Sequence, residues 1–272
     1  MKLTVLVDNS TLIDRYFRGE PGLSFLLQLP EKTLLLDTGY SDLFARNANT
    51  MGLDLTKVDT VVLSHGHNDH TWGLPTLAKL FSGTGRKPQL IAHEKAFAPK
   101  YHQGDAIGVT MPAAALTGAF QVHTQNEPLW VTPELLYLGA IPRTNDFENK
   151  SPVTSWRDAN GQLVEDFVPD DTALAYRGEE GLVIITGCSH SGICNIVEQA
   201  MALTGEKRVV DIVGGFHLLG ASPSVLEQTV SYLSKVAPQK MHPCHCTDLA
   251  AKLALSGVCP LGEVGVSTVL TY

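Results

Sequence analysis

The sequence lacks long hydrophobic runs, an excess of basic residues and a regular set of cysteines. No apolar run approaches the roughly 20 residues that a membrane-spanning helix needs. Twenty Lys and Arg against 28 Asp and Glu leave a formal net charge of −8, which disfavours binding to the polyanionic backbone of nucleic acids. The cysteines number five and are irregularly spaced, so we expect reduced thiols rather than a disulfide framework.

The composition is that of a folded chain with a sizeable core. Hydrophobic residues make up 44% of the 272 residues and charged residues 18%. The first eight residues, Met1 to Asp8, are typical of a β-strand rather than a signal peptide, so a cytoplasmic location is expected. No composition shift or long linker marks a boundary, and we expect one domain over residues 1–272 without repeats.

Short β-type runs alternate with amphipathic helical stretches along the chain. Strands are expected at Leu3–Asp8, Phe25–Leu29, Thr33–Asp37, Val58–Leu63, Gln89–Ala92, Ala173–Arg177, Leu182–Thr186, Val209–Val213, Gln239–His242 and Val264–Leu270. Helices are expected at Leu43–Met51, Trp72–Ser82, Ile193–Leu203, Ser224–Val236 and Thr247–Leu255. Two halves of this texture predict a mixed α/β fold, a four-layer αββα sandwich of two sheets covered by helices. Residues 93–133 show few periodic signals and are expected to form an irregular lid or insertion with local helix.

The strongest chemical signal is an H-x-H-x-D-H pattern at the end of a predicted strand. Its ligand types are His65, His67, Asp69 and His70. Chance would produce this pattern in on the order of one in a thousand chains of this composition. Imidazoles and a carboxylate at such spacing suit Zn²⁺ or similar borderline metals.

Two histidines of the second half also follow predicted strands and precede helices. They are His190, in Thr186-Gly187-Cys188-Ser189-His190, and His245, in His242-Pro243-Cys244-His245-Cys246. Either histidine taken alone is compatible with an ordinary polar loop residue. The H-x-H-x-D-H cluster elsewhere in the chain favours a metal-binding role for both.

With these motifs the sequence resembles the metallo-β-lactamase-fold hydrolases. The resemblance is carried by the cluster at 65–70, by Leu34-Leu35-Leu36-Asp37-Thr38-Gly39 and by Thr60-Val61-Val62-Leu63-Ser64. Further stretches resemble the subgroup named for the archaeal enzyme that condenses a dihydropterin diphosphate with ribofuranosylaminobenzene 5′-phosphate in methanopterin synthesis: Gly22-Leu23-Ser24-Phe25, Ile141-Pro142-Arg143-Thr144, Ile185-Thr186-Gly187-Cys188-Ser189-His190, Gly214-Gly215-Phe216-His217-Leu218 and His245-Cys246-Thr247. The resemblance spans nearly the whole chain and implies the αββα fold with one or two divalent transition-metal ions, Zn foremost and Mn or Fe as alternatives.

The resemblance also implies a ligand set. His65 and His67 would bind one metal, and Asp69 and His70 the other, with His245 joining the second. Many relatives place a bridging carboxylate where this chain has Cys188-Ser189-His190, and we expect His190 to be the ligand instead.

Several neighbouring residues have more than one interpretation. Asp171 is a weaker candidate for the metal surroundings, with capping or ion pairing as its alternative. Trp72 stands where relatives usually have Gly, and it either narrows the substrate groove or packs beneath it. Cys244 and Cys246 invite a zinc–thiolate interpretation, but packing at a helix start is favoured because no further cysteines accompany them. His217 is expected to act in catalysis as a proton donor, with metal ligation or a core position as alternatives.

The expected activity is metal-dependent hydrolysis of a phosphorylated small molecule, because a bound metal brings the pKa of water towards 7. Asp69 is expected to serve the reaction as well as the metal. Arg143 is a candidate for binding substrate phosphate, or else an ordinary surface arginine, and Trp72 is a second candidate for substrate binding. Three alternatives stay open: the namesake transferase reaction, iron redox chemistry and a non-catalytic ligand-binding module. Di-iron relatives usually have an acidic residue where His67 stands. No membrane or nucleic-acid partner is expected, and a homo-oligomer is compatible with the sequence.

Overall fold

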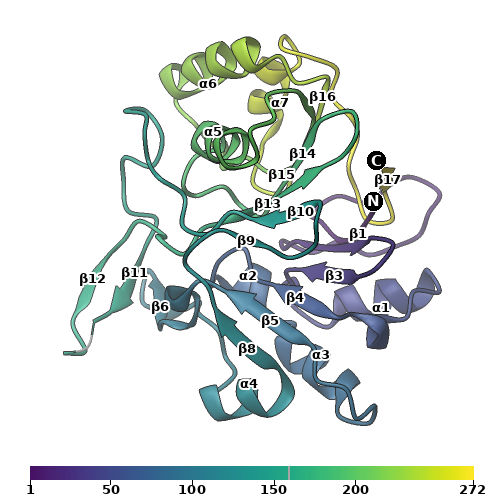
Figure 1. Ribbon diagram of the computed structural model, residues 1–272. Helices are drawn as coiled ribbons and strands as arrows, with labels where there is room; N and C mark the ends of the chain where they lie inside the picture. Colours follow the sequence, from purple (N-terminus) through teal and green to yellow (C-terminus); the bar gives the residue numbers. More distant parts are fainter. Residues whose placement is uncertain (159) are drawn as a thin grey trace. The chain divides into compact units, whose positions relative to one another are not determined.

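The computed structural model describes residues 1–158 and 160–272, and the chain divides into two compact units (Figure 1). Unit 1 comprises Met1–Gln125, Ser155–Val164 and Val264–Tyr272, and unit 2 comprises Asn126–Thr154 and Glu165–Glu263. Each unit has a sheet and a buried core of its own. The prediction of one domain over the whole chain stays a prediction.

Unit 1 is built on a seven-stranded sheet with the order β17-β1-β2-β3-β4-β5-β8. The strands are β17 (Val269–Thr271), β1 (Lys2–Val7), β2 (Ser24–Gln28), β3 (Thr33–Leu36), β4 (Thr60–Val62), β5 (Gln89–Ala92) and β8 (Gln121–Thr124). β17, β1, β2 and β3 are antiparallel neighbours, whereas β3, β4, β5 and β8 run parallel. The carboxyl ends of β3 and β4 therefore meet at one edge of the sheet, and the residues that follow these two strands become neighbours.

Helices α1 (Leu43–Thr50), α3 (Leu74–Phe81) and α4 (Ala113–Ala119) share a core with this sheet. The two longer helices bury apolar residues at helical spacing, namely Leu43, Phe44 and Ala48 on α1 and Leu74, Leu77 and Phe81 on α3. Full burial of one such side chain contributes about 1.5–3 kcal/mol, so the helices are held mainly by this apolar face. The short elements η1 (Leu55–Lys57) and α2 (Asn68–Thr71) complete the first part of the unit.

The expectation of an irregular segment over residues 93–133 is wrong as regards secondary structure. The segment contains η2 (Glu94–Phe97), β6 (Lys100–His102), β7 (Asp105–Ala106), α4, β8 and β9 (Leu129–Trp130). β6 and β7 belong to a small sheet with the order β12-β11-β6-β7, where β11 is Thr154–Arg157 and β12 is Leu163–Asp166. These elements gave little periodic signal because they are short and largely exposed: no residue of β8 is buried, and α4 buries Leu116 alone.

Unit 2 is built on a six-stranded sheet with the order β16-β15-β14-β13-β10-β9. The further strands are β16 (Lys240–Cys244), β15 (Val209–Gly215), β14 (Leu182–Thr186), β13 (Ala173–Arg177) and β10 (Leu135–Tyr137). β14, β15 and β16 are parallel, so the turns after them lie at one edge of the sheet. Helices α5 (Ile193–Thr204), α6 (Pro223–Val236) and α7 (Leu249–Leu255) share an apolar core with this sheet.

The central strands and long helices agree with the sequence prediction, including the hairpin that joins β2 to β3. The expected strand Val264–Leu270 is wrong over most of its length, because regular pairing is confined to Val269–Thr271 and residue 266 forms only an isolated bridge with Thr11. In the part of the chain that the structure describes, no helix has the length and apolarity to cross a membrane.

Candidate metal centre

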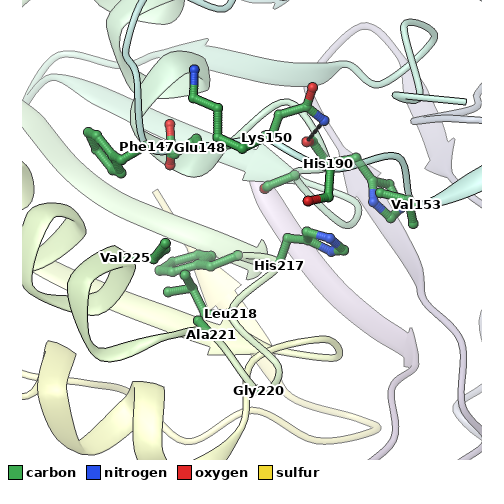
Figure 2. A pocket seen from close by; sticks show the side chains of 15 residues that line it. Phe147, Glu148, Lys150, Val153, His190, His217, Leu218, Gly220, Ala221 and Val225 are labelled. Carbon is green, nitrogen blue, oxygen red and sulfur yellow. Dashed lines mark hydrogen bonds between the residues drawn. The ribbon is translucent and has the colours of Figure 1, made fainter.

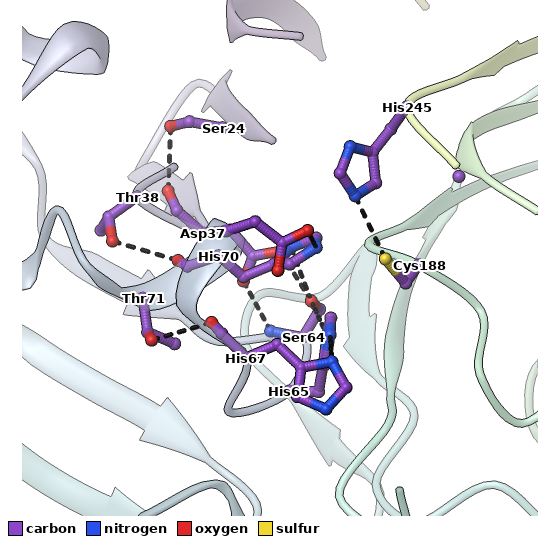
Figure 3. Close-up of polar contacts among 12 residues, drawn as sticks. Ser24, Asp37, Thr38, Ser64, His65, His67, His70, Thr71, Cys188 and His245 are labelled. Carbon is purple, nitrogen blue, oxygen red and sulfur yellow. Dashed lines mark hydrogen bonds and ion pairs between the residues drawn. The ribbon is translucent and has the colours of Figure 1, made fainter. Parts of the chain in front are cut away.

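The H-x-H-x-D-H motif of unit 1 begins in the turn after β4, which holds His65 and His67, and continues into α2, which holds Asp69 and His70 (Figure 3). The side chains of His65, His67 and His70 are buried, and that of Asp69 is 27% exposed. His65 Nε2 lies 3.0 Å from His67 Nδ1, and His70 Nε2 lies 3.5 Å from Asp69 Oδ2. The rings of His65 and His70 have centroids 4.2 Å apart. The four predicted ligands of unit 1 therefore converge.

A buried carboxylate at the end of β3 orients His70. Asp37 Oδ2 lies 2.6 Å from His70 Nδ1, and Asp37 Oδ1 accepts a hydrogen bond of 2.7 Å from the Ser64 backbone N–H. An ionised carboxylate can only accept, so His70 Nδ1 carries the proton and Nε2 carries the lone pair that a metal requires. Parallel pairing of β3 with β4 creates this contact.

The Ser64 hydroxyl orients His65 in the same way. Ser64 Oγ donates to Asp37 Oδ2 at 2.6 Å, and the same oxygen lies 3.0 Å from His65 Nδ1. Because its proton is committed to Asp37, the hydroxyl accepts from His65 Nδ1–H. His65 Nε2 is then the basic nitrogen. Asp37 and Ser64 together set the tautomers of two predicted ligands.

Close backbone packing holds the motif in place. A Cβ added to Gly66 would lie 2.1 Å from the Ala96 carbonyl oxygen, and one added to Gly73 would lie 2.2 Å from the Thr38 carbonyl oxygen. The Thr38 backbone N–H also donates to the His70 carbonyl at 2.7 Å. The turn is therefore fixed on both sides of the ligands.

Unit 2 gathers a second polar cluster at the ends of its three parallel strands. Cys188 follows β14, His217 follows β15, and His245 and Cys246 follow β16. His245 Nε2 lies 3.2 Å from Cys188 Sγ (Figure 3), and the rings of His190 and His217 have centroids 4.3 Å apart.

The backbone of this second cluster is strained at each of the three turns. Ser189, His217 and His245 have φ angles of 64°, 53° and 52°, in the left-handed region that non-glycine residues seldom adopt. Such conformations persist only where the surrounding structure enforces them, and they are concentrated at functional sites.

The electrostatics of the second cluster favour charge on sulfur and imidazole. Burial opposes ionisation of Cys246, but hydrogen bonding with Cys188 and His217 and the charge of His245 hold its pKa well below the usual value. The surroundings of His217 disfavour its cation, yet Cys246 and Asp171 raise its pKa above the usual value. Burial raises the pKa of Asp171 to about 6.

Asp171 faces the turn after β14. Its Oδ2 accepts a hydrogen bond of 2.8 Å from the Ser191 backbone N–H, whereas its Oδ1 accepts none from the described residues. This contact matches the capping interpretation of Asp171.

Two predicted substrate-binding residues have defined contacts within their own units. Trp72 stacks on Tyr40 with ring centroids 5.0 Å apart, and its Nε1 donates to the Gly108 carbonyl at 2.9 Å. Arg143 donates to Asn149 Oδ1 at 2.8 Å and to the carbonyls of Phe167 and Val168 at 2.8 and 3.0 Å. No ion pair of Arg143 is found among the described residues, and its guanidinium ties loop segments together. Its role towards phosphate stays a prediction.

The cysteines near His245 behave differently from each other. Cys244 is 1% exposed and is the last residue of β16, so it is a packing residue at a strand end rather than at the expected helix start. Packing alone does not describe Cys246, whose Sγ lies 3.3 Å from both the His217 backbone nitrogen and the Cys188 carbonyl oxygen. Asp248 caps α7 through Ala251 N–H and also accepts from Gly220 N–H, both at 2.8 Å.

Sequence reasoning missed the roles of Asp37, Cys188 and Cys246. All three follow or end a parallel strand, so the rule that placed His65, His190 and His245 at strand ends could have found them too. Asp37 in particular directly follows the apolar run Leu34-Leu35-Leu36 of β3.

Comparison with known proteins identifies the family. The profile of the metallo-β-lactamase superfamily matches residues 17–199. The chain is 28% identical over 265 residues to 7,8-dihydropterin-6-methyl-4-(β-D-ribofuranosyl)-aminobenzene-5′-phosphate synthase of Methanocaldococcus jannaschii, covering 93% of this chain and 89% of the relative. It is 32% identical over 257 residues to an uncharacterized protein of the same organism, covering 93% of each.

A solved structure agrees with these relatives. Tm1679, described as a metal-dependent hydrolase of the β-lactamase superfamily, superimposes with a TM-score of 0.86 at 28% identity, over 100% of this chain and 99% of that one. The predicted fold class and the predicted resemblance are confirmed. The chain belongs to the metallo-β-lactamase superfamily.

Proposed function

We propose that the protein is a metal-dependent hydrolase that acts on a phosphoester or diphosphate of a small molecule. The observation that carries the proposal is the Asp37–Ser64 pair, which gives His65 and His70 the tautomers that a metal needs. Such orienting partners accompany most histidine ligands, whereas histidines grouped by accident have no need of them.

The proposed ligands are those expected from the sequence, namely His65, His67, Asp69, His70, His190 and His245. Three imidazole or carboxylate groups for each of two ions leave a position open at each, as catalytic sites require. The donor set suits Zn²⁺ best, with Mn²⁺ and Fe²⁺ as alternatives. Cys188, next to His245, is an additional candidate.

A bound divalent ion supplies Lewis-acid chemistry, turning water into a nucleophile at neutral pH and stabilising charge that develops on oxygen. His217 supplies the proton. Cys246 and Asp171 raise the pKa of His217, which favours the protonated ring that can donate to the departing oxygen of the substrate. Asp69 binds metal and accepts a proton from the attacking water.

The site residues outside the metal centre are proposed to bind substrate. Trp72 and Tyr40 form an aromatic surface beside the motif of unit 1. Residues 93–133 are proposed as a lid, so bound substrate should slow proteolytic cleavage within them.

The cytoplasmic location stays a prediction.

The second candidate is the transferase activity, favoured by the similarity to the archaeal synthase over 93% of this chain. Release of diphosphate without uptake of water distinguishes it from hydrolysis. An aromatic amine would then replace water as the nucleophile.

The test begins with elemental analysis of the purified protein, followed by reconstitution with Zn²⁺, Mn²⁺ or Fe²⁺. We expect up to two ions per chain and release of phosphate from members of a phosphomonoester, phosphodiester and diphosphate panel. Absence of any metal after reconstitution would overturn the proposal. Diphosphate release that requires an aromatic amine would replace it with the transferase activity, and oxygen consumption by the iron form would point to redox chemistry.

A further inference from the structure

A pocket of about 380 Å³ in unit 2 has His190 and His217 in its wall (Figure 2). Pockets that bind small molecules measure about 300–1,000 Å³, so this one suits a single ring with a substituent rather than a large cofactor. Its apolar wall is formed by Phe147, Val153, Phe216, Leu218, Ala221 and Val225. The pocket therefore joins a polar side, where the proposed chemistry takes place, to an apolar side that can hold the rest of a substrate.

One wall is anchored by a buried carboxylate. Glu148 accepts hydrogen bonds from the backbone N–H groups of Cys194 and Asn195, at 2.9 and 3.1 Å, at the start of α5. A Cβ at Gly192 would lie 2.2 Å from Glu148 Oε2, and Gly192 has a φ of +99° that suits glycine. The wall is thus preformed, which lowers the entropy lost when a ligand binds.

A second set of contacts fixes the rim. Asn149, at a φ of 51°, donates from Nδ2 to the His190 carbonyl at 2.7 Å and accepts from Arg143 Nε. This places the next residue, Lys150, on the rim of the pocket that contains His190. Arg143 is therefore a positioning residue for the rim.

The charged residues that line the pocket favour a negatively charged ligand. Among the described lining residues, Lys150 and Glu148 are the charged side chains apart from the two histidines. Glu148 is 6% exposed and its carboxylate accepts from N–H donors, whereas Lys150 is exposed and, among the described residues, its Nζ donates to the Asn145 carbonyl at 3.4 Å. Figure 2 shows the Lys150 side chain extending away from His190 and His217, so an anion meets this lysine at the rim of the pocket and meets no accessible carboxylate of the described lining.

We propose that this pocket binds an aromatic leaving group of the substrate that carries an anionic substituent, with the ring against the half-buried Phe147 and the anion at Lys150 on the rim. The inference rests on the proposed hydrolase function and names its substrate class, an aryl phosphoester. The half-buried Phe147 ring favours an aromatic partner through stacked or edge-to-face contacts, and the buried Phe216 supports the wall from the core side. In the reaction the bond between phosphorus and the aryl oxygen breaks, and the oxygen of water bonds to phosphorus. The proton from His217 goes to the aryl oxygen, and the proton lost by water goes to Asp69.

Binding to the metal-free protein tests the pocket without requiring activity. Calorimetric titration with 4-hydroxybenzoate, a leaving group of this class, is compared with phenol, which lacks the anion, and cyclohexanecarboxylate, which lacks the aromatic ring. We expect 4-hydroxybenzoate to bind most tightly. Lys150→Gln should weaken its binding about 2- to 5-fold, as for an exposed ion pair, and leave phenol unchanged.

Two further variants complete the test. Ala221→Phe fills the pocket and should abolish binding of both 4-hydroxybenzoate and phenol, with folding checked by circular dichroism. Lys235→Gln removes an exposed lysine near the end of α6 and should leave binding unchanged.

The outcomes separate this inference from the proposed function. If no phosphoester is hydrolysed but the binding pattern holds, the hydrolase proposal fails and the pocket assignment stands. If hydrolysis occurs but Ala221→Phe leaves 4-hydroxybenzoate binding and KM unchanged, the pocket assignment is overturned. Equal binding of cyclohexanecarboxylate and 4-hydroxybenzoate would overturn the aromatic preference.

Discussion

Asp37 connects the sheet of unit 1 to its histidines, although it is not itself a proposed ligand. It accepts from Ser64 and His70 and is fully buried. Its charge raises the basicity of His70 Nε2, and its position at the end of β3 fixes the ring. A substitution of Asp37 should therefore act mainly by changing metal affinity rather than by changing a proton-transfer step.

We expect Asp37→Asn to weaken metal binding about 10- to 100-fold, because the amide presents less negative charge and changes the tautomer of His70. Competition with a chelator of known affinity measures the change. Asp59→Asn is the matched control, since Asp59 is 40% exposed and pairs with Arg86 away from the motif. Equal affinity in both variants would contradict the orienting role of Asp37.

His217 should separate catalysis from metal binding. His217→Ala is expected to keep its metal content while kcat falls about 10²- to 10⁴-fold, the usual contribution of a positioned general acid. His65→Ala and His190→Ala should lose metal as well as activity. Loss of an ion from His217→Ala by elemental analysis would instead make His217 a ligand, and the assignment of the proton donor would fail.

At the scale of elements, the turn between β4 and α2 requires glycine at position 66, because any side chain there would force neighbouring backbone to move. Gly66→Ala would place a Cβ 2.1 Å from the Ala96 carbonyl oxygen of η2. We expect the free energy of unfolding to fall by about 1–3 kcal/mol, as for overpacking elsewhere in protein cores.

The control for Gly66→Ala lies in α4. A Cβ at Gly118 meets nothing within 4 Å, so Gly118→Ala should raise the free energy of unfolding by up to about 1 kcal/mol. Urea denaturation of the two variants and the parent measures both effects. Similar stabilities for Gly66→Ala and Gly118→Ala would show that η2 moves aside at little cost.

The elements that the sequence predicted well are those with a strong period. β14 and β13 have the predicted bounds, and α5 ends one residue after its own predicted end. These elements were predictable because buried strands and amphipathic helices carry many apolar residues. β10 (Leu135–Tyr137) was not predicted, although all three of its residues are buried, since three residues are too few to show alternation. The sequence did not predict β11 and β12 for a different reason. Most of their residues are exposed or half-buried, so these strands show little apolar pattern.

The candidate site was predictable as a list of histidines but not as a network. Spacing in the sequence picks out His65, His67 and His70 because they are adjacent in the chain. The Asp37–His70 contact spans 33 residues and the Cys188–His245 contact spans 57, so both depend on strand order. Strand order follows from packing of the whole sheet, which local patterns do not encode.

At the scale of the whole molecule, stability should depend on pH through Asp171. Burial raises its pKa from 3.8 to about 6 in the folded protein. The folded state therefore retains the proton to a higher pH than the unfolded state does. Stability is greatest below pH 3.8 as far as this group is concerned, and it falls as pH rises through the interval up to about 6.

Asp171→Asn removes this dependence, because an amide does not titrate. Its Oδ1 can still accept from the Ser191 N–H, as Asp171 Oδ2 does. Unfolding of the metal-free protein by urea between pH 4 and 8 measures the difference between variant and parent. Between pH 4 and 7, the free energy of unfolding of the variant should rise relative to that of the parent by about 3 kcal/mol at most, at about 1.4 kcal/mol per pKa unit. Above pH 7 the difference should stay constant. Parallel pH profiles for the two proteins would mean that Asp171 is ionised at no cost, held by positive charge from His217 rather than destabilised by burial.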